Sequence, residues 1–384
     1  MSRIHVCLVS EQTIPNILGI YHFKPERVVF CTTERMEQEK RTDAIINTLK
    51  LYGLDYSGSN LYDRIKVDQD CLEDCELKFK DEIVQKYGKD KLTVNLTGGT
   101  KIMVLGAYNV FKDAAEQMIY TPIPKNEFLV VYPQGGDCKS PVSLNLRLSV
   151  EAYVTAYGIK VKNSNKIEQL KSNALKNKDL CEWMAQNYKD IEGLLIKFYE
   201  HLKGYRDDKC FQLKMDCIPN RQEEKEFLRM FGFVDEKIEK ILLKHEIRFM
   251  TGDWLSGLCF NEICKLSVDD CVTEIKLISS KGMDNEFDVM FTKDNALYIV
   301  ECKSLKQEHD KDADILYKIS SLQHDFGLRV KGFLVSTART IISDKGGIEE
   351  NVIKRAEQCK SQVIHPDEIK NFSIWIKNYV NGLT

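Results

Sequence analysis

The sequence predicts an α/β protein built from two α/β units with a helical region between them. Residues 1–150 alternate short apolar runs with helical stretches, which is typical of a largely parallel sheet with buried strands. Residues 151–250 form a connector followed by a segment rich in Lys, Leu, Asn and Glu at helical spacing. Residues 251–384 return to alternating strand and helix signals, so we expect a second core there.

The first unit should hold a Rossmann-like sheet. Its expected strands are the apolar runs Ile4–Val9, Val28–Cys31, Thr93–Leu96 and Phe128–Tyr132. Its expected helices are Arg41–Tyr52 and Lys101–Met118. In the middle region, apolar residues recur on one helical face at Ile191, Leu194, Leu195, Phe198 and Tyr199. A core-facing helix is the simplest interpretation of that face.

The second unit is expected to begin with a helix over Trp254–Leu266. Four strands should follow, over Val272–Ile278, Glu286–Thr292, Leu297–Cys302 and Lys331–Ser336. Further helices are expected near 311–326, 347–359 and 366–380.

Composition excludes several classes of protein. The chain has 384 residues and a net charge of −3, which argues against a broadly basic surface but permits a local basic channel. No apolar run is long enough to span a bilayer and no signal peptide is present, so we expect a cytoplasmic protein without a membrane partner. The 13 cysteines include no CxxC pair and several lie in apolar segments, which favours buried free thiols.

A hairpin in the second unit carries the most informative residues. Two apolar runs flank Asp294-Asn295, which is good chemistry for a two-residue turn. A turn at that point sets Asp288 opposite Glu301, with Cβ atoms about 5 Å apart. Lys303 shares a strand face with Glu301 because strand side chains alternate.

Two interpretations of this hairpin remain open. Two carboxylates in an apolar setting raise each other's pKa, and a divalent cation would resolve that conflict. Lys303 beside them could hold an attacking water or stabilise charge on a phosphate, as phosphodiester hydrolysis requires. The alternative is a plain ion pair between Glu286 and Lys303 at the sheet end.

Two polar loops in the first unit are candidates for ligand binding. A glycine-rich turn joins a strand to a helix N-terminus, which suits a phosphate, and a second loop follows the first strand. In an open α/β sheet both lie at the carboxyl edge, where ligands bind. An ordinary turn with a threonine N-cap is the alternative. The candidate residues are Ser10, Gln12, Thr13, Asn95, Thr97, Gly98, Gly99, Thr100 and Lys101.

The hairpin also resembles a known family. Asn-Glu-Phe-Asp-Val, a turn, and Leu-Tyr-Ile-Val-Glu-Cys-Lys are similar to the core motif of PD-(D/E)xK nucleases, which have a restriction-endonuclease-like fold. The resemblance implies that Asp288 and Glu301 are catalytic metal ligands and that Lys303 is a catalytic residue assisting the water. Ser256 stands where that family often has a helical acidic residue. Glu262 is then either a substitute ligand or, as we favour, a surface residue.

The first unit resembles CARF domains, through Leu8 to Thr13 and Asn95 to Lys101. A CARF domain before a PD-(D/E)xK nuclease domain is similar to the cyclic-oligoadenylate-activated ancillary nucleases of type III CRISPR defence. The resemblance implies a homodimer, cyclic tetra-adenylate as activator and Mn²⁺ or Mg²⁺ as cofactor. It also implies cleavage of single-stranded RNA or DNA, or nicking of duplex DNA.

Two alternatives to this function stay open. The chain could be a CARF-containing regulator that binds nucleic acid without cutting it, with a decayed site marked by Ser256. It could also be a nuclease that cyclic oligoadenylate does not control.

Overall fold

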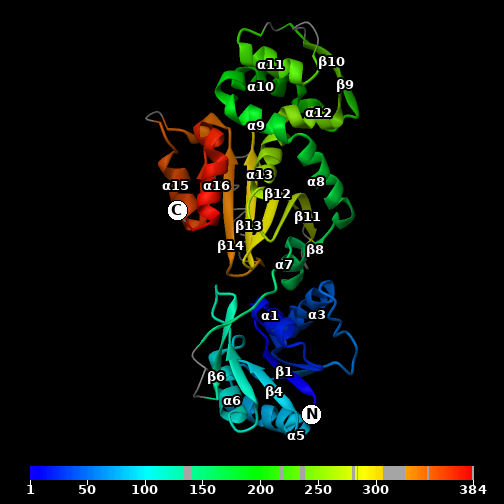
Figure 1. Cartoon of the computed structure of the whole chain (residues 1–384), viewed down its shortest axis with the longest axis vertical. Helices are drawn as coiled ribbons and strands as arrows, with labels where there is room; N and C mark the ends of the chain where they lie inside the picture. The colour runs from blue at the N-terminus through cyan, green and yellow to red at the C-terminus, as the bar shows by residue number, and fades with distance from the viewer. Residues whose placement is uncertain are drawn as a thin grey trace.

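The computed structural model describes residues 1–133, 140–216, 219–233, 238–278, 282, 284–305, 325–343 and 346–382. The molecule is elongated (Figure 1), with the N-terminal sheet at one end and the C-terminal sheet in the middle. A lobe formed by part of the middle region, residues 188–248, lies at the opposite end. None of the described helices combines the length and apolar character needed to cross a bilayer.

The N-terminal sheet has the strand order β3-β2-β1-β4-β5-β6-β7. The strands are β1 (Arg3–Leu8), β2 (Arg27–Thr32), β3 (Tyr62–Lys66), β4 (Lys91–Asn95), β5 (Gln117–Tyr120), β6 (Glu127–Tyr132) and β7 (Val142–Ser143). Pairing is parallel from β3 to β5 and antiparallel beyond. This pairing confirms the predicted largely parallel α/β fold. The central strands are apolar and are covered on both faces, as a parallel sheet requires.

The helices of this domain are α1 (Ile14–Phe23), α2 (Glu34–Gln38), α3 (Arg41–Leu51), α4 (Leu72–Lys78), the π-helical turn η1 (Phe79–Val84), α5 (Gln85–Tyr87) and α6 (Lys101–Phe111). The helix expected over Lys101–Met118 was predicted too long. It ends at Phe111, and the chain then turns into β5. Pairing with β4 buries the side chains of Met118 and Ile119 completely. The free energy gained by this burial and pairing exceeds what a longer helix would gain.

The middle region is only partly helical. It holds α7 (Val150–Ala156), β8 (Lys160–Val161), the 3-10 turn η3 (Ser164–Lys166), α8 (Ile167–Lys176), α9 (Lys178–Gln186), α10 (Tyr188–Leu202), η4 (Lys203–Tyr205), β9 (Cys210–Met215), α11 (Gln222–Met230), β10 (Ile238–Leu243) and α12 (Lys244–Arg248). Of the apolar face predicted on α10, Ile191, Leu194, Leu195 and Phe198 are buried and Tyr199 is half-buried. The antiparallel β9–β10 pair was not expected from the sequence.

The C-terminal sheet has the order β15-β14-β13-β12-β11-β8. Its strands after β8 are β11 (Asp270–Ile278), β12 (Asp284–Lys293), β13 (Ala296–Lys303), β14 (Val330–Ser336) and β15 (Ser361–Ile364). Its helical elements are η5 (Phe249–Asp253), α13 (Trp254–Cys264), η6 (Arg339–Ile341), α15 (Glu350–Gln358), η7 (Pro366–Asn371) and α16 (Phe372–Val380). The helix expected near 311–326 falls almost entirely outside the described residues.

The β12–β13 hairpin has the predicted register. Met290 pairs with Ile299 and Val289 with Val300, and the turn residues Asp294 and Asn295 have φ values of 52° and 57°. Two positive φ values define a type I′ turn, which matches the twist of the strands it joins. The register therefore follows from the turn chemistry.

One prediction about the faces of this hairpin was wrong. Regular alternation along this strand predicts that Phe287 packs on the same face as Val289 and Phe291, yet Phe287 lies in the core cluster on the other side of the sheet. Glu274, on the neighbouring strand β11, has a φ of 49°, and the alternation of both strands changes at this level. A left-handed residue rotates the strand locally, so the side chains beyond it exchange faces.

Candidate functional site

The hairpin opens into a cavity of about 230 Å³ at the end far from its turn. The paired register of β12 with β13 runs only to Val289–Val300, so the strands separate where the cavity begins. Asp288, Glu301 and Lys303, the three predicted catalytic residues, all line it. The remaining lining residues are Arg206, Arg248, Thr251, Gly252, Asp253, Ser256, Glu286, Cys302 and Ser304.

The carboxylate of Asp288 is held in place at the point where β12 and β13 separate. Its Oδ2 accepts a hydrogen bond of 2.7 Å from the backbone N–H of Cys302, in place of a ladder partner. Its backbone oxygen accepts a 3.0 Å bond from the hydroxyl of Thr273 on β11. Burial raises the pKa of Asp288 to about 7, and the nearby carboxylate of Glu301 adds to the rise. The cavity thus holds two acids that resist being charged together.

The other two residues come from β13, which is held on its far side by β14. Glu301 is paired with Leu334 and is only 4% exposed, whereas Lys303 is half-buried and paired with Ser336. Glu286 was considered as an ion-pair partner for Lys303. Its carboxylate lies 2.9 Å from the ammonium of Lys276 on β11.

The helical side of the cavity is built around Asp253. Arg206 donates to Asp253 Oδ1 at 2.9 Å and Arg248 to Oδ2 at 2.8 Å, so two guanidinium groups fix this carboxylate. The backbone reaches this position through Gly252, whose φ of 144° suits glycine. A Cβ at Gly252 would lie 3.0 Å from Cβ of Ser304, so the close approach to β13 also needs glycine.

Sequence reasoning missed both arginines of this site. Arg206 precedes β9 and Arg248 ends α12, so they come from the middle region. Neither belongs to the nuclease motif, and only their convergence on Asp253 reveals them. In the sequence, only the Gly252-Asp253 pair just before the expected helix indicates a special position on this wall of the cavity.

Glu262, the possible substitute for the missing helical acid, lies apart from the cavity. Its side chain is buried, so the favoured surface interpretation was wrong, and it forms a 2.7 Å ion pair with Lys265. It lies outside the set of residues that line the cavity. Ser256 does line the cavity, and its hydroxyl donates to the backbone oxygen of Asp253.

The carboxylates of this cavity fit a divalent cation in part. Asp288 and Glu301 are oxygen donors in one buried space, where burial and the neighbouring carboxylate raise the pKa of Asp288, and a bound cation would oppose that rise. Within the described parts of the chain, however, no three His, Cys, Asp or Glu side chains are grouped to hold a metal ion. The described cysteines are free thiols, and most are buried as predicted, but Cys210 and Cys264 are exposed.

The glycine-rich loop of the N-terminal domain has the geometry of a strand-to-helix turn. Thr100 caps α6 by accepting from Met103 N at 3.3 Å, and Lys101 is exposed in the first turn. Gly98 passes so close to strand β1 that a Cβ would lie 2.0 Å from the oxygen of Leu8. Gly99 has a φ of 76°. Both glycines are therefore required by the backbone itself.

Two other candidates in this loop support its shape. Asn95 is fully buried, and its Oδ1 accepts from the backbone N–H and the hydroxyl of Thr97 at 3.0 and 2.6 Å. Thr97 Oγ1 also accepts from Thr121 N at 2.8 Å. Ser10, after β1, is half-buried and accepts from Gln12 N at 3.3 Å. The loop after β1 and the loop after β4 thus lie at the same edge of the sheet, where Lys101 is exposed and Thr100 is half-buried.

Gln12 and Thr13 instead reach the neighbouring domain. Thr13 is fully buried, and its hydroxyl donates to the oxygen of Ala156 in α7 at 2.6 Å. Gln12 Oε1 accepts from the hydroxyl of Tyr157 at 3.2 Å and from Leu328 N, just before β14, at 3.3 Å. Thr13 thus joins the predicted ligand edge to α7, and Gln12 joins it to the segment that leads into β14.

Fold and cavity together define a two-domain protein, with a CARF-type domain before a nuclease-type domain. Residues 4–153 match the model of the Card1 CARF domain, and residues 243–382 match the Card1-like endonuclease domain. The chain therefore carries a CARF domain followed by an endonuclease domain.

Two solved structures have the same fold along the full chain. Protein VC1899 from Vibrio cholerae is 18% identical, with a TM-score of 0.80 over 99% of this chain and 98% of that one. Can2 from Sulfobacillus thermosulfidooxidans, solved with cyclic tetra-adenylate, is 20% identical, with a TM-score of 0.72 over 97% and 98%. No curated protein sequence matches the chain.

Proposed function

We propose that this protein is a metal-dependent nuclease that cyclic oligoadenylate activates, as an accessory enzyme of type III CRISPR defence. One observation carries the proposal. A single hairpin presents Asp288 and Glu301 at its open end and contacts the N-terminal domain through its turn. A ligand in the CARF domain could therefore act on the nuclease site through a continuous element.

In the proposed reaction, Asp288 and Glu301 are the ligands of Mg²⁺ or Mn²⁺. A cation held by these two carboxylates would supply Lewis-acid chemistry and would favour ionisation of water. Lys303 stabilises the charge that develops on the phosphate, and its ammonium helps to orient the attacking water. Asp253, fixed between Arg206 and Arg248, shapes the helical wall of the same cavity.

The proposed activator is cyclic tetra-adenylate, the ligand in the Can2 structure. Lys101 and the N-terminus of α6 offer a positive charge and free N–H groups to its phosphates. A ring with two-fold symmetry suits two copies of the domain about one axis, so we propose a homodimer. The proposed division is a sensor over 1–150, a connecting region over 151–250 and a nuclease core over 251–384.

Activation is proposed to pass through the contacts between the domains. A ligand bound at the carboxyl edge of the N-terminal sheet would shift Gln12, whose side chain forms hydrogen bonds with Tyr157 and Leu328. Such coupling requires that the ligand bind better to the active arrangement than to the inactive one.

Cleavage assays test this proposal. Purified protein is incubated with Mn²⁺ and labelled single-stranded RNA, single-stranded DNA and supercoiled plasmid, with and without each cyclic oligoadenylate. We expect cleavage that depends on both metal and ligand. Binding of nucleic acid without cleavage under any divalent metal would instead support a regulator.

A further inference from the structure

Two arginine side chains from the middle region enter the cavity of Asp288 and Glu301. Arg206 directly follows η4, and Arg248 is the last residue of α12. The side chains of both are 35% exposed, so they are accessible from the cavity. The sequence motif that predicts the nuclease hairpin includes neither of them, and the proposed reaction has so far given them no contact with the substrate.

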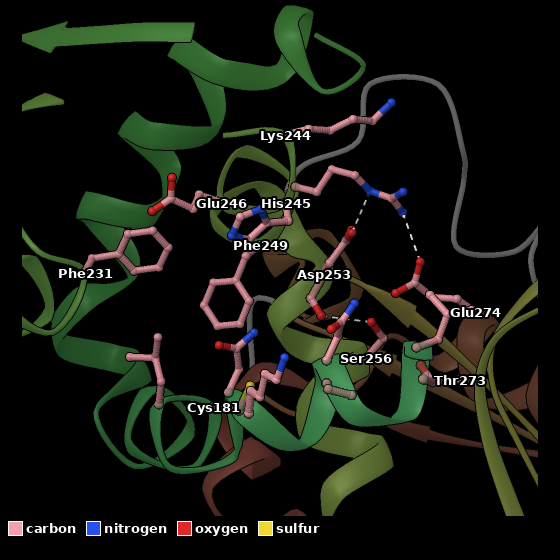
Figure 2. Close-up of a pocket in the computed structure, with 18 of the residues that line it drawn as sticks. Cys181, Phe231, Lys244, His245, Glu246, Phe249, Asp253, Ser256, Thr273 and Glu274 are labelled. Carbon is pink, nitrogen blue, oxygen red and sulfur yellow. Dashed lines mark hydrogen bonds and ion pairs between the residues drawn. The ribbon is translucent and has the colours of Figure 1, made fainter. Parts of the chain in front are cut away.

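A single carboxylate holds the two guanidinium groups in place. Nη2 of Arg206 donates to Oδ1 of Asp253 at 2.9 Å, and Nε of Arg248 donates to Oδ2 at 2.8 Å. Nη1 of Arg206 also donates to the backbone oxygen of Thr251 at 3.0 Å. Arg248 has a longer ion pair of 3.6 Å with Glu274, and dashed lines in Figure 2 link both acids to it. Because these bonds restrict the rotamers of both arginines, binding of a ligand would cost less conformational entropy.

Both guanidinium groups retain the capacity to bind an anion. A guanidinium carries five N–H groups in a planar fork, and the bonds to Asp253 take one from each arginine. The second acid, Glu274, lies farther from Arg248 than Asp253 does, so it offsets less of the positive charge. Among the described residues that line this cavity, none is aromatic and none has a large aliphatic side chain. The lining therefore suits a small charged group.

The arrangement of the two walls matches a phosphodiester. One wall carries Asp288, Glu301 and Lys303 from the hairpin, and the other carries the two arginines. Forked guanidinium groups bind phosphate oxygens through paired hydrogen bonds, which a lysine cannot do. Arg248 also lines a larger neighbouring cavity of about 790 Å³, so the cavity between the walls can be reached from the side of α12.

We propose that Arg206 and Arg248 bind the scissile phosphate of the nucleic-acid substrate through its non-bridging oxygens. The inference rests on the proposed nuclease function and identifies the residues that recognise the substrate backbone in that site. The middle region then completes the active site of the C-terminal domain, because both phosphate-binding side chains come from it. The hairpin alone would present only one of the two walls.

Binding in EDTA tests this proposal without cleavage. Fluorescence anisotropy measures the affinity of the full-length protein for labelled single-stranded RNA and DNA 12-mers at a series of NaCl concentrations. The variants are Arg206→Gln and Arg248→Gln, together with Arg206→Lys and Arg248→Lys, which keep the charge but lose the fork. Arg229→Gln is the control, because Arg229 is an exposed residue of α11 that pairs with Glu226 outside the cavity.

We expect each Gln variant to bind about ten-fold more weakly at low salt. The slope of log K against log salt concentration should also flatten by about 0.7, the value for one phosphate contact on a single strand. Both Lys variants should lose affinity but keep the wild-type slope, and Arg229→Gln should keep both.

A purely structural role predicts that the Lys and Gln variants lose affinity alike while the slope stays unchanged. That result, or a wild type that does not bind the 12-mers in EDTA, would overturn the phosphate site. A wild type that binds as expected yet never cleaves with metal and activator would contradict the nuclease function alone.

Discussion

Asn295, in the turn of the nuclease hairpin, donates a hydrogen bond of 3.0 Å to Oδ1 of Asn126 in the CARF domain. Asn126 in turn donates to the backbone oxygen of Asp294 at 2.9 Å. Asn295 is fully buried and also donates to Leu146 O and accepts from Leu148 N. The two strands joined by this turn carry Asp288 and Glu301 at their other end. We therefore propose that the turn couples the CARF domain to the cavity of the nuclease domain.

Asn126→Ala tests that coupling. The change removes the side-chain bonds to the turn but leaves the ligand loops untouched, so we expect unchanged affinity for cyclic tetra-adenylate. Ligand-stimulated cleavage should fall about five-fold or more, since coupling energies are typically of this size. Calorimetry measures the first quantity and a cleavage time course the second. Asn109→Ala, at an exposed position bonded to Glu76, is the control and should behave as wild type.

Lys101→Ala tests the ligand edge. Loss of a cation at the N-terminus of α6 should weaken binding of cyclic tetra-adenylate about ten-fold. Lys112→Ala, an exposed lysine at the other end of the same helix, should leave it unchanged. If Lys101→Ala also cleaves normally at every ligand concentration, the nuclease is not controlled from this edge.

Much of this site could be predicted from the sequence because it is local. The turn chemistry of Asp294-Asn295 determines the hairpin register as far as Val289 and Val300, and Asp288 and Glu301 follow directly, where the strands separate. The approach of Arg206 to Asp253 could not be predicted, because it depends on packing between segments 47 residues apart. The left-handed Glu274, which sends Phe287 to the other face, carries no residue-type signal, since glutamate rarely adopts that conformation.

The pKa of Asp288 predicts how stability depends on pH in the metal-free protein. Its value is raised from 3.8 to about 7, so the folded state holds this proton more tightly than the unfolded chain. The contribution of Asp288 to stability should therefore increase as the pH falls from about 7 towards 4. Asp288→Asn can still accept from Cys302 N and should lose this dependence. Melting temperatures of both proteins in EDTA across this range measure it, and parallel curves would contradict the assignment.

Glu262→Gln tests the missing helical ligand. Glu262 is buried and paired with Lys265 away from the cavity, so the change should cost about 1 kcal/mol of stability. Cleavage and its dependence on Mn²⁺ concentration should stay as in the wild type. A large rise in the Mn²⁺ concentration needed for half-maximal cleavage would show that Glu262 reaches the metal after all.

Cleavage by Glu301→Ala, compared with wild type in Mn²⁺ and saturating cyclic tetra-adenylate, tests the central claim most directly. Glu301 is buried in the cavity that we propose as catalytic, so its loss should abolish cutting of labelled RNA and DNA while ligand affinity, measured in parallel, is unchanged. We expect the wild type to cut only when both metal and ligand are present. Full activity of Glu301→Ala, or equal cutting by the wild type without ligand, would contradict the account.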